Sequence, residues 1–187
     1  LGTEIFVEGF GIKSYDNDNS QNGDLTSDLE QDRTYGNVFL ATEYLPSEHW
    51  ILSVGGNMNF SNYKNKDQFV VGNNDLSGDH AFSPIFSPKV SVTRHLSKKI
   101  SAYGLISHGF SLPTFDETLN PKGDINEDIR PEKGFNYELG IKGSAFGDKV
   151  YAELVYYTMR INDLLVARRN SELDYSGYNA GKSTHNG

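Results

Sequence analysis

The feature that most constrains the fold of this chain is a two-residue alternation of side-chain character. In residues 149–158, which read KVYAELVYYT, apolar side chains fall on one set of alternate positions and Glu153 falls on the other set. Residues 133–142 (KGFNYELGIK) separate aromatic and aliphatic side chains from Asn, Glu and Lys in the same way. A helix would spread these charges around its circumference, whereas a strand sorts them onto one face. The pattern therefore predicts strands, and further segments rich in aromatic and β-branched residues lie near 3–13, 34–45, 49–61, 87–96 and 99–110.

The connections between these segments alternate between long and short. Polar stretches occupy 14–33, 62–86 and 111–133, with a moderately long one at 162–175. Tight turns separate them, around Pro46, around Ser97 and at Gly147–Asp148. Because antiparallel strands send alternate connections to opposite ends of a sheet, all long loops lie at one end and all tight turns at the other. This asymmetry is typical of outer-membrane barrels. The chain is therefore predicted to be all-β, an antiparallel transmembrane β-barrel in part, with about eight or nine meandering strands of a larger barrel.

Composition narrows the class of protein further. The 187 residues carry 25 acidic and 17 basic side chains, a formal net charge of −8, which argues against a nucleic-acid partner. The absence of cysteine excludes disulfides and thiolate metal sites. The apolar runs are only a few residues long, far short of the roughly 20 that a membrane helix needs. A barrel accounts for this polar composition, because only the outward face of each strand touches lipid.

Aromatic residues concentrate towards both ends of the predicted strands. Two such bands match the aromatic girdles of a membrane barrel, although aromatic residues also favour strands in general. The band near the tight turns comprises Tyr44, Trp50, Phe146 and Tyr151, and the band towards the long loops comprises Tyr15, Phe60, Tyr63, Phe110, Phe135 and Tyr157.

Residues 87–182 resemble the barrel of TonB-dependent outer-membrane receptors. A strand, a short turn and a second strand end in a Gly-Phe-x-x-Pro-Thr-x-x-Glu element, followed by an Asn-acid-apolar-Pro-Glu-Lys segment, an acidic aromatic strand and an Asn-Ala-Gly element. The matching residues are Gly109, Phe110, Pro113, Thr114 and Glu117, then Asn126, Pro131, Glu132, Lys133, Asn136, Tyr137, Glu138 and Gly140, and finally Asn179, Ala180 and Gly181. The sequence departs from the family pattern at Glu127, where Pro is usual. Residues 1–86 fit by general pattern only.

The resemblance implies that residues 1–187 form a segment of a receptor barrel, with no plug domain in the chain. Such a barrel encloses an N-terminal plug and belongs to an active transporter. The transporter binds a scarce ligand of the siderophore, cobalamin or glycan class and imports it with energy supplied by TonB through a segment ahead of the plug. The implied location is the outer membrane of a Gram-negative bacterium, with lipid, TonB and an unknown ligand as partners. No cofactor and no enzymatic activity are implied.

Three charged residues are candidates for contact with the lumen or the plug. Glu138, Lys142 and Glu153 share the inward face of the predicted strands. The alternative is that they pair with one another across strands, since opposite charges on neighbouring strands stabilise a sheet by roughly 0.2–1 kcal/mol per pair. Ligand contacts are expected from the loops at 14–33, 62–86 and 111–133.

Other motifs indicate less. Asp16, Asp18 and Asp24 alternate with other oxygen-bearing side chains as in a calcium loop, but Gly23 is misplaced for an EF-hand and Ser27 stands where the bidentate Glu belongs. A solvated acidic loop is the alternative. The chain offers no combination of nucleophile, base and oxyanion donor. A soluble or surface-anchored all-β glycan-binding module remains the alternative to the receptor barrel.

Overall fold

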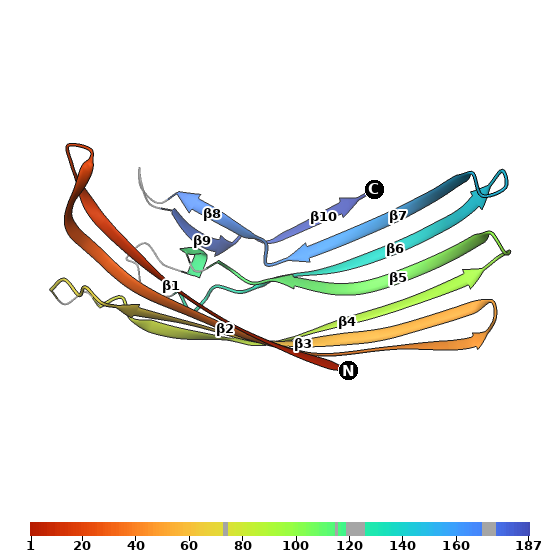
Figure 1. Ribbon diagram of the computed structural model, residues 1–187, viewed down its shortest axis with the longest axis horizontal. Coiled ribbons are helices and arrows are strands. Elements are labelled where there is room, and N and C mark those ends of the chain that lie inside the picture. The colour runs from red at the N-terminus through yellow and green to blue at the C-terminus, as the bar shows by residue number, and fades with distance from the viewer. Residues whose placement is uncertain (73–74, 115, 119–125, 170–174) are drawn as a thin grey trace.

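A computed structural model shows one long, curved antiparallel sheet with a small hairpin beside it (Figure 1). The structure describes all residues except 73–74, 115, 119–125 and 170–174. In the described residues the main sheet has eight strands in the order β1-β2-β3-β4-β5-β6-β7-β10, and β8 pairs with β9 in a second sheet. The predicted all-β, antiparallel, open piece of a barrel is confirmed. The bounds of the strands are β1 Gly2–Asp18, β2 Gln21–Ser47, β3 Trp50–Asp67, β4 Gly78–His95, β5 Ile100–Ser111, β6 Glu132–Ala145, β7 Val150–Asn162, β8 Leu165–Arg169, β9 Tyr175–Asn179 and β10 Lys182–Asn186.

The three predicted tight turns lie at one end of the sheet. β2 ends at Ser47 and β3 begins at Trp50, β4 and β5 are joined through 96–99, and β6 and β7 through 146–149. The last turn has positive φ at Phe146, Gly147 and Asp148. Short connections of this kind hold the register of adjacent antiparallel strands.

The long connections at the opposite end differ from the prediction. Residues 14–33 are not a loop, because β1 and β2 continue as a paired hairpin up to a turn at Asn19–Ser20. The 62–86 connection is likewise mostly strand, and only 68–77 joins β3 to β4. Of the three long loops predicted, the one at 111–133 is closest to the structure, since 112–131 connect β5 to β6 with one short 3-10 helix, η1, at Asp116–Thr118.

One face of the main sheet, the outer face, is apolar over a continuous band. Register places Tyr44, Leu52, Val92, Gly104, Leu139 and Tyr156 in one row across six strands. The next row on this face is Thr42, Val54, Val90, Ile106, Tyr137 and Thr158. Arg94 lies at the tight-turn end of this band, where its guanidinium is 5.1 Å from the Trp50 ring centroid, and Lys133 and Arg160 lie on the same face towards the long-loop end.

The height of this band matches a bilayer. On β3 the outer positions run from Trp50 to Phe60 without a charge, and they change to Asn62, Lys64 and Lys66 beyond that point. A stretch of this length extends roughly 33 Å, which at a barrel tilt of about 40° corresponds to about 25 Å along the membrane normal. The strands therefore continue past the apolar band at the long-loop end.

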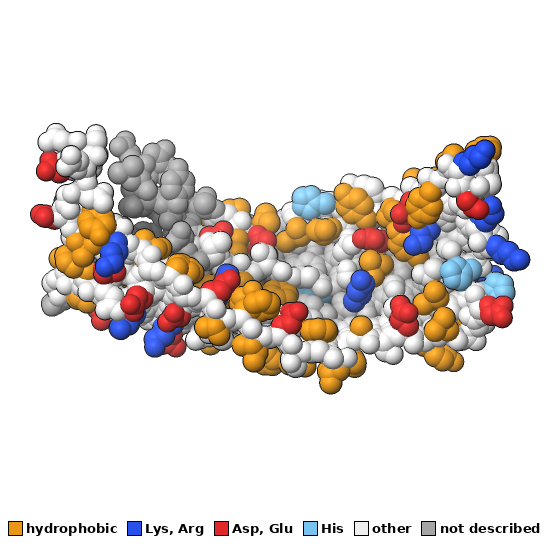
Figure 2. Space-filling view, viewed as in Figure 1, with side chains coloured by type: hydrophobic (Ala, Val, Ile, Leu, Met, Phe, Trp, Pro, Cys, Tyr) orange, Lys and Arg blue, Asp and Glu red, His pale blue; other side chains and the backbone are white. Residues whose placement is uncertain are grey.

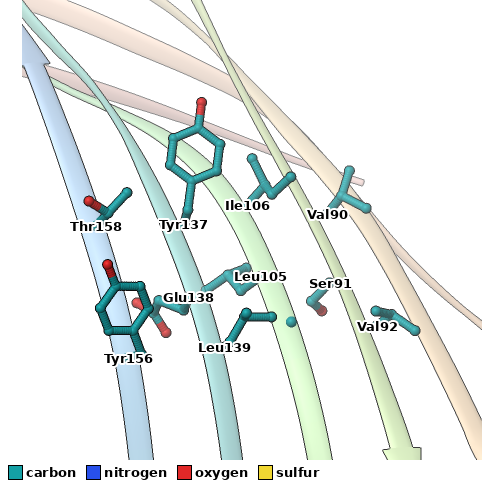
Figure 3. Close-up of a pocket in the computed structure, with 11 residues that line it drawn as sticks. Val90, Ser91, Val92, Leu105, Ile106, Tyr137, Glu138, Leu139, Tyr156 and Thr158 are labelled. Atoms are coloured by element: carbon teal, nitrogen blue, oxygen red, sulfur yellow. The ribbon is translucent and has the colours of Figure 1, made fainter. Parts of the chain in front are cut away.

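The apolar band contains a shallow groove centred on Gly104 (Figure 3). Side chains from β4 to β7 line it, among them Val92, Ile106, Tyr137 and Leu139. The missing side chain of Gly104 between Val92 and Leu139 accounts for the hollow. Its position on the lipid-facing side separates this groove from the candidate site.

The opposite, inner face is mostly polar and carries the small core of the molecule. Tyr63 and Phe82 are buried there with Ile129 from the 112–131 loop, and Leu112 and Leu165 pack against them. Tyr63 is only 1% exposed, so its predicted place in an outward aromatic girdle is wrong. Tyr151 and Tyr157 also share the inner face, with Glu153 between them. Within the described ranges, no helix is long and apolar enough to cross a membrane.

Candidate functional site

The candidate site lies on the inner face at the long-loop end, where four strands align one residue each. Glu8, Arg33, Tyr63 and His80 stand directly opposite one another on β1 to β4. Arg33 donates to Glu8 from Nε at 2.7 Å and also from Nη2. Its guanidinium carbon lies 5.8 Å from the Tyr63 ring centroid. The positive charge of Arg33 is therefore paired within the wall of the site.

The 112–131 loop folds against this row. The Tyr63 hydroxyl donates to the carbonyl oxygen of Pro113 at 2.6 Å, and Pro113 is itself fully buried. Ile129 closes the contact from the other end of the loop. A buried tyrosine with its hydroxyl satisfied contributes both apolar area and a directional bond. Tyr63 thus anchors the loop on the inner wall.

The Pro-Thr-x-x-Glu element closes the start of the loop on itself. The Thr114 backbone N–H and the Thr114 hydroxyl both donate to Glu117 Oε2, at 2.7 and 2.9 Å. The Glu117 N–H is 3.4 Å from Thr114 Oγ1. This reciprocal arrangement resembles a capping box and satisfies donors at the start of η1.

Asn179 connects the same loop to the β8–β9 hairpin. Its Oδ1 accepts from the Arg130 N–H at 3.0 Å, while its Nδ2 donates to the carbonyl oxygens of Arg130 at 2.8 Å and Asp163 at 2.7 Å. Arg130 and Asp163 also form an ion pair at 3.0 Å. One carboxamide therefore holds three backbone groups from two connections.

The family-motif residues are placed around these contacts. Glu132 Oε1 accepts from the Leu165 N–H at 2.6 Å, which fixes the start of β8. Pro131 is buried just before β6, and Lys133 lies within β6. Gly109 and Phe110 lie at the end of β5, where Gly109 is opposite Gly134. Tyr137 faces outwards in the apolar band, whereas Glu138 faces inwards.

The three charged residues expected in the lumen share the inner face nearer the tight turns. Lys142 and Glu153 are directly opposite each other. No ion pair joins Glu138, Lys142 and Glu153 in the described part of the chain. Tyr103 contacts two of these residues instead. Its hydroxyl donates to Glu153 at 3.0 Å, and Lys142 Nζ lies 5.6 Å from its ring centroid. Asn136 donates to Glu138. Contact with a plug stays a prediction.

Gly140 makes the position of Tyr103 feasible. The two residues are directly opposite on β6 and β5, and a Cβ at Gly140 would lie 2.4 Å from the tyrosine ring. The ring covers the bare backbone of the glycine, an arrangement that stabilises antiparallel sheets. The Tyr103 hydroxyl can therefore reach Glu153 on β7 across the glycine.

A cleft of about 230 Å³ separates the folded loop from β1 and β2. Its lining consists of Phe10, Ile12, Gln31, Asp32, Arg33, Tyr63 and Thr114. Gln31 is 2% exposed, and its side-chain oxygen has no hydrogen-bond partner in the described residues. The sequence predicts a loop at Gln31 and Arg33, and only the strand register brings them onto the wall beside Tyr63.

The acidic hairpin shows no built metal site. Asp16 and Asp18 lie on β1 and Asp24 on β2, on either side of the Asn19–Ser20 turn. Among the residues that the structure describes, no three His, Cys, Asp or Glu side chains are grouped so that they could hold a metal ion. The calcium hypothesis for this hairpin therefore gains no support from the geometry.

A curved sheet with one apolar face of bilayer height, one polar face, and locked loops at one end defines a segment of a membrane-embedded β-barrel wall. A family model described as "TonB dependent receptor-like, beta-barrel" matches residues 3–187, and the chain belongs to that family. Members of the family are transporters of the Gram-negative outer membrane and not enzymes. No curated protein matches the chain.

Solved structures show the same fold at low sequence identity. The alcaligin outer-membrane receptor FauA from Bordetella pertussis is 18% identical over 83% of this chain and 26% of its own, with a TM-score of 0.56. The ferric-catecholate import receptor Fiu from E. coli K12 is 13% identical over 97% of this chain and 30% of its own, at 0.64. The pyoverdine receptor FpvA from Pseudomonas aeruginosa PAO1 is 17% identical over 89% and 23%, at 0.61. The chain thus spans about a quarter to a third of these receptors.

Proposed function

We propose that this chain is the barrel-wall portion of an outer-membrane active transporter that binds a scarce ligand and imports it with energy supplied by TonB. The observation that carries the proposal is the division of one sheet into a lipid-facing band and a polar inner wall whose loops are locked inwards at one end. A wall of this kind encloses a polar passage and presents a structured rim to ligand.

The ligand class that we favour is a siderophore. The solved receptors with the same fold include proteins named for alcaligin, ferric catecholate and pyoverdine. Cobalamin and glycans stay as the other ligand classes. The described structure does not favour a soluble glycan-binding module. The outer face of the main sheet is apolar over the height of a bilayer, which a soluble protein would have to cover.

The barrel wall also needs a partner inside it. Glu138, Lys142 and Glu153 present charges to the lumen, and the side-chain oxygens of Asn57 and Asn136 are buried on the same face without partners in the described residues. Buried acceptors of this kind call for a donor from water or from another segment. We assign these contacts to a plug domain, through which TonB would act.

The proposal is tested with the complete receptor that contains this chain. Membranes from expressing cells are fractionated, and unheated and boiled samples are compared by electrophoresis. Uptake of radiolabelled ferric siderophores is then measured in iron-starved cells with and without TonB. We expect an outer-membrane protein whose band shifts on boiling and whose uptake requires TonB. A periplasmic or soluble protein without that shift contradicts the barrel assignment, and uptake that is equal without TonB contradicts active transport.

A further inference from the structure

The cleft between β1, β2 and the folded 112–131 loop contains a polar side chain that the fold leaves unsatisfied. Gln31 is 2% exposed, yet its Oε1 has no hydrogen-bond partner in the described residues. Its cross-strand neighbour Asn65 is also 2% exposed and also has an unpartnered side-chain oxygen. The Asn65 amide nitrogen is occupied, because it donates to the Leu76 carbonyl oxygen at 2.8 Å. Two adjacent buried acceptors therefore lack donors.

Among the described residues that line the cleft, none carries an unpaired positive charge, and Asp32 adds a carboxylate. Arg33 is the cation that lines the cleft, and it is paired with Glu8. Phe10, Ile12 and the Tyr63 ring supply the apolar part of the lining. An anionic group entering here would lose its water and would meet a guanidinium that is already neutralised. A neutral group with an O–H or N–H donor would satisfy Gln31 without that penalty.

The charge of the long-loop end of this chain also disfavours an anionic ligand. Residues 13–33, 64–80, 112–133 and 160–182 contain 18 acidic and 11 basic residues, which leaves this end with a formal charge of −7. The remaining 7 acidic and 6 basic residues leave the rest of the chain at −1. Two lysines on the long strands pair with carboxylates, Lys13 with Asp28 and Lys66 with Glu30. Figure 2 shows acidic and basic side chains interspersed at this end of the molecule. An acidic rim repels polyanionic ligands on approach, attracts cationic ones, and leaves the approach of neutral ones unhindered.

We propose that this cleft is a ligand subsite in which Gln31 accepts a hydrogen bond from a hydroxyl or amide N–H on a neutral, partly apolar portion of the ligand. The subsite rests on the proposed transport function and narrows it. Among ferric chelates it favours an uncharged trihydroxamate over a trianionic tris-catecholate. Thr114 and Tyr63 hold the loop side of the cleft in place, and Gln31 supplies the recognition.

The test measures concentration-dependent uptake of a neutral ferric trihydroxamate and a ferric tris-catecholate by the complete receptor, in iron-starved cells that lack other siderophore receptors. Gln31→Leu removes the acceptor and keeps a side chain of similar size. The matched control is Asn186→Leu, which removes an amide on β10 that contacts Thr158 and lies outside the cleft. A band that shifts on boiling establishes that each variant is folded.

We expect the wild type to take up the trihydroxamate, with a half-saturating concentration that rises about tenfold in Gln31→Leu, the effect of losing one hydrogen bond of about 1.4 kcal/mol. Asn186→Leu should leave it within about twofold. Preference for the tris-catecholate, or an unchanged half-saturating concentration in Gln31→Leu, would overturn the subsite while leaving the transport function intact. Absence of TonB-dependent uptake of either chelate would instead overturn the proposed siderophore transport, and the subsite with it.

Discussion

At the scale of single residues, the motif that identified the family is explained by loop architecture. Thr114, Glu117, Glu132 and Asn179 form hydrogen bonds within their own connection or with backbone groups of a neighbouring one. In the connections between β5 and β6 and between β7 and β10, the backbone lacks the hydrogen bonds of the main sheet. These side chains supply hydrogen bonds in their place. A backbone away from a sheet needs such partners when it is partly buried.

Asn179→Ala should release the contact between the 112–131 loop and the β8–β9 hairpin. It removes three hydrogen bonds, each with a net contribution of about 0.5–1.5 kcal/mol, so local docking should weaken by about 1.5–4.5 kcal/mol. Hydrogen exchange measured in the complete receptor should be faster at the Arg130 amide by roughly tenfold or more. Asn186→Ala is the matched control, because Asn186 contacts Thr158 and neither connection. Unchanged exchange at Arg130 would contradict the role of Asn179.

Asp148 gives the tight-turn end a predictable response to pH. The Ser144 hydroxyl, foremost, and Lys99 hold the pKa of the Asp148 carboxyl below its ordinary value. A lowered pKa means that the ionised form is favoured in the folded state, so its stabilising effect is present above the ordinary pKa of about 4 and is lost as the pH falls through the lowered value. The urea midpoint for unfolding should therefore be higher for the wild type than for Asp148→Asn at pH 7, and the two midpoints should converge as the pH falls below the lowered pKa of Asp148. A constant difference across this range would exclude the carboxylate as its source.

At the scale of elements, two adjacent residues on β5 should differ in how strongly a lysine substitution destabilises the barrel. Ile106 lies near the middle of the outer apolar band, while Leu105 lies on the inner face opposite Glu138. A lysine in contact with lipid near the bilayer midplane costs about 2–4 kcal/mol. Ile106→Lys should therefore reduce the stability of the barrel in lipid vesicles by about 2–4 kcal/mol. Leu105→Lys should change that stability by less than about 1 kcal/mol. Equal effects at the two positions would contradict the assignment of the faces.

The strands also show which parts of the fold could be predicted from the sequence. Within the membrane band, one face is apolar and the other polar, so the alternation around Glu138 and Glu153 predicts both the strands and their faces. Beyond the band the outer face of β1 and β2 also becomes polar, and the alternation disappears although the backbone pairing continues. The sequence therefore predicts a loop at 14–33 where the structure has a hairpin. The site depends on that same pairing, because Gln31 and Arg33 reach Tyr63 only through the register of β2 and β3.

At the scale of the whole molecule, the two ends of the sheet are built for different tasks. The tight-turn end has short connections and a nearly neutral charge, and it needs only to hold register. The long-loop end carries most of the acidic residues, the folded 112–131 loop and the cleft beside Gln31. A single layer of sheet with only three described residues in its buried hydrophobic cluster has little core of its own, so neighbouring strands, lipid and an internal partner must supply most of its burial.

The 187-residue chain on its own should consequently associate in water. Its eight-stranded sheet ends at β1 and β10, and each presents an edge with unpaired backbone groups. Large apolar side chains such as Leu139 and Leu154 are 67% and 74% exposed on the outer face. Unpaired edges favour pairing between copies, and exposed apolar patches favour association of faces. Light scattering should therefore report oligomers or aggregates in plain buffer and smaller particles in detergent, while the complete receptor in detergent should be monodisperse. A stable monomer of the isolated chain in buffer would contradict both the unpaired edges and the lipid-facing role of the outer face.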